Sequence, residues 1–360
     1  MIADFDFYRL EIPMVKEFRI SLGSTKKYEG FLVRLRTDEG IEGWGEGVPT
    51  PFITGETMGS VEAALVGIRE LVTGMNEASS EQIWEAMQGS VVGSYAAKCA
   101  IDTALWDIAG KRCGLPVSSM LGGYRERVRT SFTVDLGTIE EAGKSAGEFA
   151  AMGLGAVKVK LGLGIAEDYE RVKVVRERIG TGKVLYVDFN QSYTPKKAVE
   201  LAQAIHRFEV EFLEQPTPAR DIAGLKFVRE HSPLPVMADE SVHGPEDVIE
   251  IVRQEAADMI NLKLMKAGGI TRGRKVVELA EAAGMPVMIG CMVETKIAVT
   301  AGTHLALGMR NVRYADLDGY TSLKDDVTRN GVSLQNGENR VSGKPGLGIE
   351  VDPGAGRELA

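Results

Sequence analysis

The sequence predicts an α/β protein whose centre is a (β/α)8 barrel of the TIM type, joined to an α+β capping domain. Three observations lead to this fold class. Eight short apolar runs alternate with amphipathic stretches across about 190 residues, which is the element order of a parallel barrel. Most of these runs end on an ionisable residue, and barrel enzymes place their chemistry at those ends. An open doubly wound sheet is the alternative, but its usual glycine-rich dinucleotide fingerprint is missing from the sequence.

The N-terminal part of the chain predicts the capping domain. Residues 31–37 alternate apolar and basic side chains, which is typical of a strand. An earlier strand at 5–12 is expected to pair with it across a loop at about 18–29. Residues 95–109 are strong helix formers with apolar side chains at helical spacing, and Gly110, Gly114 and Pro116 end this helix.

The barrel elements follow one another through the middle of the chain. The expected strands are 128–134, 156–161, 184–188, 211–214, 236–239, 258–263, 287–291 and 312–316. The expected helices between them include 165–179, 195–208, 222–230, 246–254 and 271–283.

The C-terminal stretch, 331–360, has strand-like pieces without helical periodicity, and we expect it to return to the N-terminal sheet. The predicted domains are therefore a capping domain of 1–125 completed by 325–360, and a barrel domain of 126–324.

Composition excludes several classes of protein. The chain has 360 residues and a formal net charge of -9, which argues against nucleic acid or an anionic membrane as the main partner. No apolar run approaches the roughly 20 residues that span a bilayer. The three cysteines show no metal-ligand spacing, and the N-terminus shows no signal-peptide pattern. We therefore expect reduced thiols in a cytoplasmic protein.

One apolar run carries two lysines at alternate positions, Lys158 and Lys160. In a strand both side chains point to the same face. Crowding and partial burial both favour a neutral amine, so either lysine is a candidate general base. An edge strand that uses lysine to prevent aggregation is the alternative for this segment alone.

Carboxylates end three consecutive predicted strands, at Asp188, Glu214 and Asp239. Their spacing is about one strand and one helix, so they are expected to meet at one rim of the barrel. Three converging carboxylates repel one another unless a cation lies between them. Oxygen-only ligands suit Mg²⁺, with Mn²⁺ as a possible substitute, and Asn190 lies on the same face as Asp188 as a partner of that ligand.

A lysine lies on each side of this carboxylate group, Lys160 before it and Lys263 after it. Two facing bases can remove a proton from the carbon next to a carboxylate and return one to the opposite face. This arrangement predicts a racemase or epimerase. Elimination or cycloisomerisation with the same groups, a Schiff-base aldolase and a metal-binding scaffold without activity are the alternatives.

The combined motifs resemble the enolase superfamily, in its muconate-lactonizing-enzyme subgroup. The resemblance covers essentially the whole chain, and it implies the barrel, the capping domain and the Mg²⁺ site. It also implies that Lys158 keeps Lys160 basic but neutral, and that Glu240 supports the metal ligands. The motifs are Lys158-x-Lys160, Asp188-x-Asn190, Glu214-Gln-Pro216, Asp239-Glu-Ser241 and Asn261-Leu-Lys263.

Two further stretches, Gly290-Cys-Met-Val-Glu-Thr295 and Asp316-x-Asp318, resemble the dipeptide epimerases of this subgroup. The resemblance implies that Asp316 and Asp318 bind the substrate's α-ammonium group, which two carboxylates can hold by charge-assisted hydrogen bonds. It also implies that the enzyme inverts the C-terminal residue of a dipeptide and forms a homo-oligomer. The alternatives on the same scaffold are an N-acylamino acid racemase, an o-succinylbenzoate synthase and a muconate-type cycloisomerase. Further substrate contacts are implied for Thr133, Cys291 and Met292.

Family members specific for a C-terminal glutamate place an arginine in the loop after the first strand. The best-matching position here is Gly23, and the nearby Arg19 does not align. Without a fixed guanidinium, a side-chain carboxylate has no bidentate partner. We therefore expect a dipeptide whose second residue is neutral, with a hydrophobic residue preferred, rather than glutamate.

Overall fold

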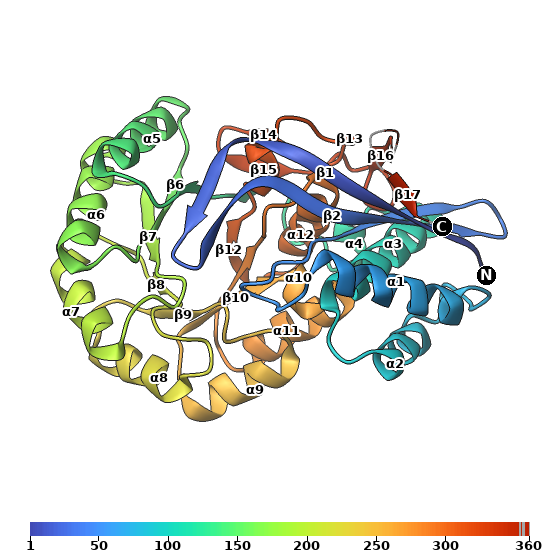
Figure 1. Cartoon of the computed structure of the whole chain (residues 1–360), viewed down its shortest axis with the longest axis horizontal. Helices are drawn as coiled ribbons and strands as arrows, with labels where there is room; N and C mark the ends of the chain where they lie inside the picture. The colour runs from blue at the N-terminus through green and yellow to red at the C-terminus, as the bar shows by residue number, and fades with distance from the viewer. Residues whose placement is uncertain (353, 355–356, 360) are drawn as a thin grey trace.

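The computed structural model describes residues 1–352, 354 and 357–359, and it confirms a parallel barrel with an N-terminal cap (Figure 1). The eight strands form one sheet in chain order, and its two edges meet at a single bridge between Thr130 and Ala315. The barrel is therefore nearly closed. Its strands are β5 (Phe132–Val134), β6 (Ala156–Lys160), β7 (Val184–Asp188), β8 (Leu213–Glu214), β9 (Val236–Ala238), β10 (Met259–Lys263), β11 (Val287–Gly290) and β12 (Val312–Asp316).

Helices connect these strands because parallel neighbours need a crossover on the outside of the sheet. Helices α5 to α9 form the outer layer around one side of the barrel in Figure 1. A short 3-10 helix, η2, follows the last strand in place of a long helix, and the chain leaves the barrel there. The helices are α5 (Ile139–Ala151), α6 (Ile165–Ile179), α7 (Pro195–Ile205), η1 (His206–Phe208), α8 (Ile222–His231), α9 (Pro245–Gln254), α10 (Leu264–Ala267), α11 (Ile270–Ala282), α12 (Lys296–Gly308) and η2 (Gly319–Ser322).

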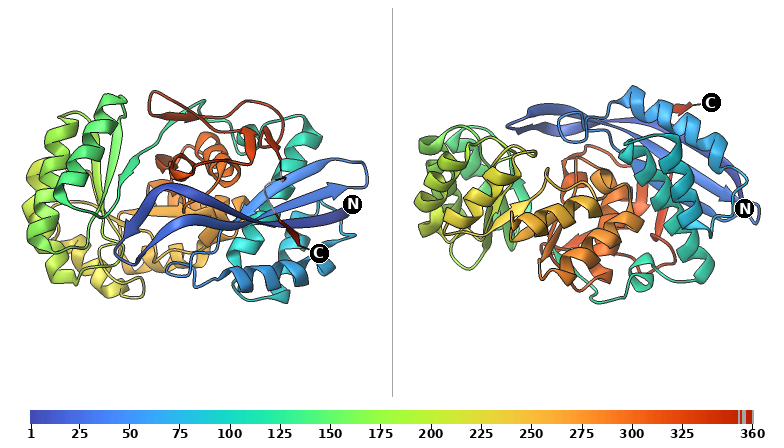
Figure 2. Two further views of the ribbon diagram at one scale, coloured as in Figure 1. Left: turned by 45° about the horizontal axis from the view of Figure 1, so that its top comes forward. Right: turned by 90° about the horizontal axis from the view of Figure 1, so that it is seen from below.

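The capping domain packs an antiparallel sheet against helices beside the barrel (Figure 2). The expected loop at 18–29 is wrong, because the two long strands pair as far as Ile20 and Gly23. Irregular register between Pro13 and Phe18 interrupts the alternation that would have revealed this strand. The elements are β1 (Ile2–Ile20), β2 (Gly23–Thr37), β3 (Glu42–Gly47), α1 (Met58–Val72), α2 (Ser80–Ser90), α3 (Tyr95–Cys113) and α4 (Val117–Met120).

The C-terminal strands divide between the two parts of the molecule. Strand β17 pairs with β1, as expected, whereas β14 and β15 continue a small sheet with β4 at the start of the barrel domain. The predicted strand 128–134 is thus two strands in different sheets. Residues 353, 355–356 and 360 of the predicted tail lie outside the described residues. The remaining strands are β4 (Val128–Arg129), β13 (Thr328–Asn330), β14 (Ser333–Gln335), β15 (Glu338–Arg340), β16 (Ile349–Val351) and β17 (Arg357–Leu359).

Large side chains fill the inside of the barrel below its carboxyl-terminal rim. Tyr186, Phe212, Met237, Met259 and Met288 form this buried cluster. The interior is therefore a packed core rather than a channel. Within the described residues, we find no helix with the length and apolar character that crossing a membrane requires.

Glycines allow β3 and α3 to pack backbone against backbone. A Cβ atom at Gly45 would lie 1.8 Å from the carbonyl oxygen of Ala100, and one at Gly43 would lie 2.2 Å from that of Ala104. Real Cβ atoms cannot approach backbone so closely. The contact between the capping sheet and its central helix therefore depends on these residues having no side chain.

We predict that Gly45→Ala destabilises the protein by about 1–3 kcal/mol, because the added methyl overpacks this contact. Thermal unfolding of the purified variant measures the effect. Gly67→Ala on the exposed face of α1 is the matched control, since its Cβ meets nothing within 4 Å and alanine is the better helix former. Equal melting temperatures for Gly45→Ala and wild type would contradict the packing argument.

Candidate active site

Parallel register brings the predicted site residues to one rim of the barrel. Lys160 lies level with Asp188, and Asp188 lies level with Glu214 on the next strand. Across the barrel, Lys263 of β10 and Asp316 of β12 both lie level with Gly290 of β11. The predicted rim residues therefore converge at the carboxyl-terminal ends of the strands, where barrel enzymes place their chemistry.

Asp188, Glu214 and Asp239 form a buried carboxylate triad. Each side chain is 0% exposed, and one oxygen from each lies within 4.8 Å of the others. Burial, with repulsion from Asp188, raises the pKa of Glu214 well above its usual range. Three hard oxygen donors at this separation fit a Mg²⁺ ion, which would relieve their mutual repulsion.

Neighbouring amides hold the triad in place. Asn190 donates from its backbone to Asp188 (2.8 Å) and from its side chain to Glu240 (3.1 Å), while the Asn261 amide donates to Glu214 (2.9 Å). Asn190 and Gln215 both adopt positive φ values, of 38° and 35°. Such backbone strain outside glycine is uncommon and concentrates at functional sites.

The two proposed bases, Lys160 on β6 and Lys263 on β10, lie on opposite sides of the barrel. Their strands are four apart in a ring of eight. Lys160 contacts Asp188 at 2.6 Å, and Lys263 contacts Asp239 at 2.7 Å. Both ammonium groups are nearly buried, with the residues 6% and 3% exposed. The carboxylate triad therefore lies on the strands that separate the two lysines.

Lys158 lies on the same face of β6 as Lys160, as the spacing predicts, and both side chains contact Asp188. Its ammonium contacts Asp316 at 2.8 Å, Glu214 at 2.9 Å and Asp188 at 3.0 Å. Burial alone would lower the pKa of Lys158, but these three carboxylates together hold it well above its usual range. The expectation that crowding with a second lysine keeps the amine neutral is therefore wrong for Lys158.

A fourth lysine, Lys266, completes the group and was not identified from the sequence. It is 0% exposed, and its ammonium contacts the side chain and the backbone carbonyl of Asp239 as well as the carbonyl of Asn261. Its position three residues after Lys263 was the available signal. The site therefore alternates buried cations with buried anions, which limits the cost of burying either.

Asp316 and Asp318 both border the site, in unequal surroundings. Asp316 is 5% exposed and accepts hydrogen bonds from Lys158 and from Ser131 (2.7 Å). Asp318 accepts one from the backbone of Thr133 (2.9 Å) and is partly exposed. Burial and the neighbouring Asp316 raise the pKa of Asp318 to about 7.

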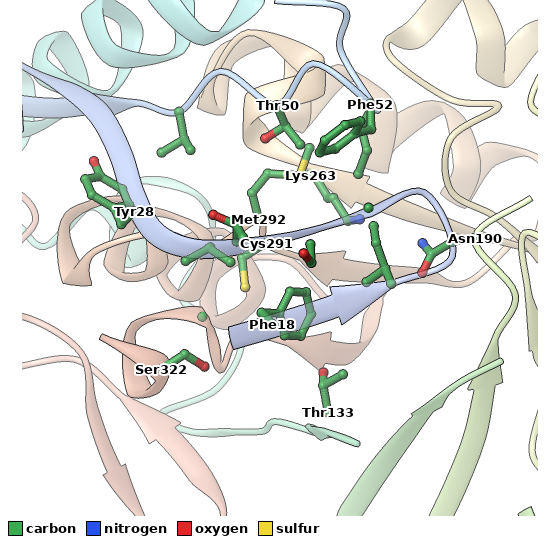
Figure 3. Close-up of a pocket in the computed structure, with 18 of the residues that line it drawn as sticks. Phe18, Tyr28, Thr50, Phe52, Thr133, Asn190, Lys263, Cys291, Met292 and Ser322 are labelled. Atoms are coloured by element: carbon green, nitrogen blue, oxygen red, sulfur yellow. The ribbon is translucent and has the colours of Figure 1, made fainter. Parts of the chain in front are cut away.

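A cavity of about 330 Å³ lies between these rim residues and the cap (Figure 3). Residues of the β1–β2 hairpin and of the loop at 48–53 form its roof. Phe18, Tyr28 and Phe52 are among the roof side chains that Figure 3 shows around the same space as Lys263 and Thr133. The predicted residues that line it are Gly23, Thr133, Lys158, Lys160, Asn190, Lys263, Cys291, Met292, Asp316 and Asp318.

The hairpin is fastened to the barrel rim at its tip. The Ser21 hydroxyl donates to the backbone carbonyl of Asn190 (2.9 Å), beside the end of β7. Gly162, after β6, has a φ of +136°, and a Cβ there would lie 2.9 Å from the Ser21 side chain. This close approach places the roof directly over the two strands that carry Lys160 and Asp188.

Among the described residues that line the roof, both lysines are already paired with carboxylates. Lys16 pairs with Asp135 (2.7 Å), and Lys27 pairs with both Glu11 and Glu29 (3.0 Å each). At Gly23, a Cβ would lie 3.0 Å from the ring of Phe52. The position expected to carry an arginine in glutamate-specific relatives is therefore covered by an aromatic ring.

Sequence comparison assigns both parts of the chain to one known family. Residues 7–122 match the profile "Mandelate racemase / muconate lactonizing enzyme, N-terminal domain". Residues 141–355 match "Enolase C-terminal domain-like". The two matches together cover most of the sequence.

Characterised relatives cover nearly the full chain. It is 39% identical to the L-Ala-D/L-Glu epimerase of Bacillus subtilis over 95% of this chain and 94% of the relative. It is 38% identical to the hydrophobic dipeptide epimerase of Enterococcus faecalis, over 90% and 92% respectively. The crystal structure of the E. faecalis dipeptide epimerase with Mg and L-Leu-L-Tyr superposes with a TM-score of 0.95, at 37% identity, covering 97% of this chain and 99% of that one. An N-succinyl-L-Arg/Lys racemase of Bacillus cereus is 32% identical, over 99% and 97%.

We predict that Glu214→Gln weakens Mg²⁺ binding by about tenfold or more, because it removes one anionic oxygen ligand from the triad. Isothermal titration calorimetry with MgCl₂ measures the affinity. Glu211→Gln provides the control, since Glu211 lies shortly before the same strand and bonds Tyr314 instead. Wild-type affinity in Glu214→Gln, or an equal loss in Glu211→Gln, would exclude the triad as the metal site.

Proposed function

The chain belongs to the mandelate racemase/muconate lactonizing enzyme family of the enolase superfamily, and from this membership we propose that it is a Mg²⁺-dependent dipeptide epimerase. It inverts the α-carbon of the C-terminal residue by 1,1-proton transfer between two lysines. One observation carries this proposal: Lys160 and Lys263 lie on opposite sides of the barrel mouth, with the carboxylate triad between them.

The proposed steps follow from this placement. With a metal ion held by the triad, a dipeptide whose carboxylate lay at that end of the cavity would present its α-carbon between β6 and β10, the strands that carry Lys160 and Lys263. In its neutral amine form, Lys160 removes the α-proton from one epimer, and the ammonium group of Lys263 delivers a proton to the opposite face. For the other epimer the roles reverse, as microscopic reversibility requires. Each lysine is held by a carboxylate, Asp188 or Asp239, which fixes the direction of its approach.

Asp188, Glu214 and Asp239 would hold a Mg²⁺ ion, which would supply positive charge to the negative charge that develops when the α-proton leaves. Mn²⁺ is the expected substitute. The cap contributes by excluding water from the reacting carbon, which strengthens the electrostatic interactions inside the cavity.

Asp316 and Asp318 favour a dipeptide over an amine-free acid. Both line the cavity, and two carboxylates at one end of it suit a cationic α-ammonium group. Cycloisomerisation and succinylbenzoate synthesis use substrates without this cation. Because the B. cereus relative is an N-succinyl-L-Arg/Lys racemase, N-acylamino acid racemisation is the second candidate function. A substrate series with and without the free α-amine separates dipeptide epimerisation from this reaction.

We propose that the second residue of the dipeptide is apolar rather than glutamate. Phe18, Ile20 and Phe52 line the roof, and the two lysines there, Lys16 and Lys27, are already paired. The E. faecalis hydrophobic dipeptide epimerase, 38% identical, supports this choice. The B. subtilis L-Ala-D/L-Glu epimerase, 39% identical, makes a direct comparison of substrates necessary.

Two further expectations accompany this function. The three cysteines are free thiols, which accords with a cytoplasmic location. We also propose a homo-oligomer, and sedimentation velocity of the purified protein measures its state.

We predict that Lys160→Ala and Lys263→Ala each lower epimerisation by about 10²–10⁴-fold, because each removes one of the two bases. The two variants should differ in exchange. In D₂O with Mg²⁺, each should still exchange the α-proton of the one epimer that its remaining lysine serves. ¹H NMR of each pure epimer follows the exchange. Lys226→Ala on α8 controls for loss of a lysine elsewhere. Loss of exchange from the same epimer in both variants would contradict the two-base assignment.

We predict that wild-type enzyme prefers L-Ala-L-Leu over L-Ala-L-Glu by about tenfold or more in kcat/KM, since the roof is apolar and its cations are paired. Phe52→Ala should narrow this preference by removing apolar contact with the leucine side chain. Val92→Ala, at an exposed residue that does not line the cavity, should leave the ratio unchanged. A wild-type preference for the glutamyl dipeptide would refute the assigned specificity.

A further inference from the structure

A line of three buried side chains runs from the inside of the barrel to the edge of the cavity. The Tyr186 hydroxyl lies 2.5 Å from Ser131 Oγ, and Ser131 Oγ lies 2.7 Å from Asp316 Oδ1. Tyr186 and Ser131 are each 1% exposed. Neither of them lines the cavity, whereas Asp316 does.

The direction of these hydrogen bonds follows from the groups involved. An ionised carboxylate can only accept, so the Ser131 hydroxyl must donate to Asp316. The oxygen of Ser131 is then left to accept, and the Tyr186 hydroxyl donates to it. Tyr186 therefore orients the Ser131 hydroxyl, and Ser131 donates one hydrogen bond to Oδ1 of Asp316.

Packing and backbone contacts restrict the conformations of the Tyr186 and Ser131 side chains. The Tyr186 ring stacks on Phe212 with centroids 4.4 Å apart. The Ser131 amide donates to the carbonyl of Ala315 (2.9 Å), at the place where the two edges of the barrel meet. The two strands that would separate if the barrel opened are thus β5, which Ser131 directly precedes, and β12, which ends on Asp316.

The second oxygen of Asp316 is held in a similar way by Lys158, at 2.8 Å. Each carboxylate oxygen can accept more than one hydrogen bond, so Asp316 keeps capacity for a substrate N–H. Its orientation, however, is set from two sides before any substrate arrives. Pre-orientation of this kind lowers the cost of binding, because the carboxylate does not need to be ordered at that moment.

We propose that Ser131 and Tyr186 are positioning residues that hold Asp316 for the α-ammonium group of the dipeptide. This inference rests on the proposed function and extends it from the cavity wall into the barrel interior. Recognition of the substrate's free amino terminus then depends on two side chains that do not line the cavity. Ser131 acts directly on Asp316, and Tyr186 acts through Ser131.

The test compares two probes that differ only in the amine, L-Ala-L-Leu and propanoyl-L-leucine, each with Mg²⁺. In Ser131→Ala we expect the Kd and KM of the dipeptide to rise about tenfold, in line with loss of a hydrogen bond to a charged group. The kcat should change by less than about twofold, since the substitution leaves the two bases, Lys160 and Lys263, in place. The Kd of propanoyl-L-leucine should stay at the wild-type value, because this probe has no ammonium group. Calorimetry and steady-state epimerisation give these values.

Companion variants separate positioning from simple structural support. Ser131→Thr keeps the hydroxyl and should restore dipeptide affinity. Tyr186→Phe keeps the ring and should give a smaller loss of the same kind, and it serves as the test if Ser131→Ala does not fold. In an Asp316→Asn background, Ser131→Ala should add no further loss. Ser118→Ala, at a buried serine of α4, controls for removal of a buried hydroxyl.

Equal loss of affinity for both probes in Ser131→Ala and Tyr186→Phe would overturn the inference, as would unchanged dipeptide affinity in both. In either case wild-type epimerisation of L-Ala-L-Leu would leave the proposed function intact. Failure of the wild-type enzyme with every free dipeptide would instead overturn the proposed function, together with the ammonium site that this inference extends.

Discussion

The arrangement of the site depends on the ion pairs that the buried ammonium group of Lys158 makes with three carboxylates. This group joins Asp188 and Glu214, which we assign to the metal, to Asp316, which we assign to the substrate amine. These carboxylates would repel one another if no cation lay between them. Lys160, Lys263 and Lys266 repeat the arrangement around the rim. Pairing buried anions with buried cations is what allows so many charges to converge in one cavity while each stays oriented.

The barrel and the cap contribute different things to this site. The barrel fixes the lysines and carboxylates, because parallel register aligns the ends of adjacent strands. The cap covers them with apolar side chains, and it is attached through Ser21 at its tip and through Glu46, which accepts hydrogen bonds from Thr295 and Ala298 at the start of α12. We therefore propose that the barrel residues carry out the chemistry and that the roof residues select the side chain of the substrate.

Much of the barrel and its rim could be predicted from the sequence, because each strand is a local apolar run that ends on a polar residue. Strands β7 and β12 have the expected bounds. Features set by distant residues could not be predicted in this way. The hairpin lost its alternation at a register shift, Lys266 lay outside the strand pattern, and the charge of Lys158 depends on carboxylates from three other strands. Ser131 lies two residues before Thr133, and Tyr186 lies two residues before Asp188 on β7. Only the closure of the barrel brings Ser131 to Asp316.

The central claim is that two bases transfer protons on opposite faces of one α-carbon. Epimerisation of L-Ala-L-Leu by the wild-type enzyme in D₂O with Mg²⁺ tests it most directly, with mass spectrometry and ¹H NMR of early time points. We predict that the product epimer carries one deuterium at the α-carbon of leucine, while recovered substrate stays largely unlabelled. Product that forms without deuterium, or label at any other carbon, would contradict it.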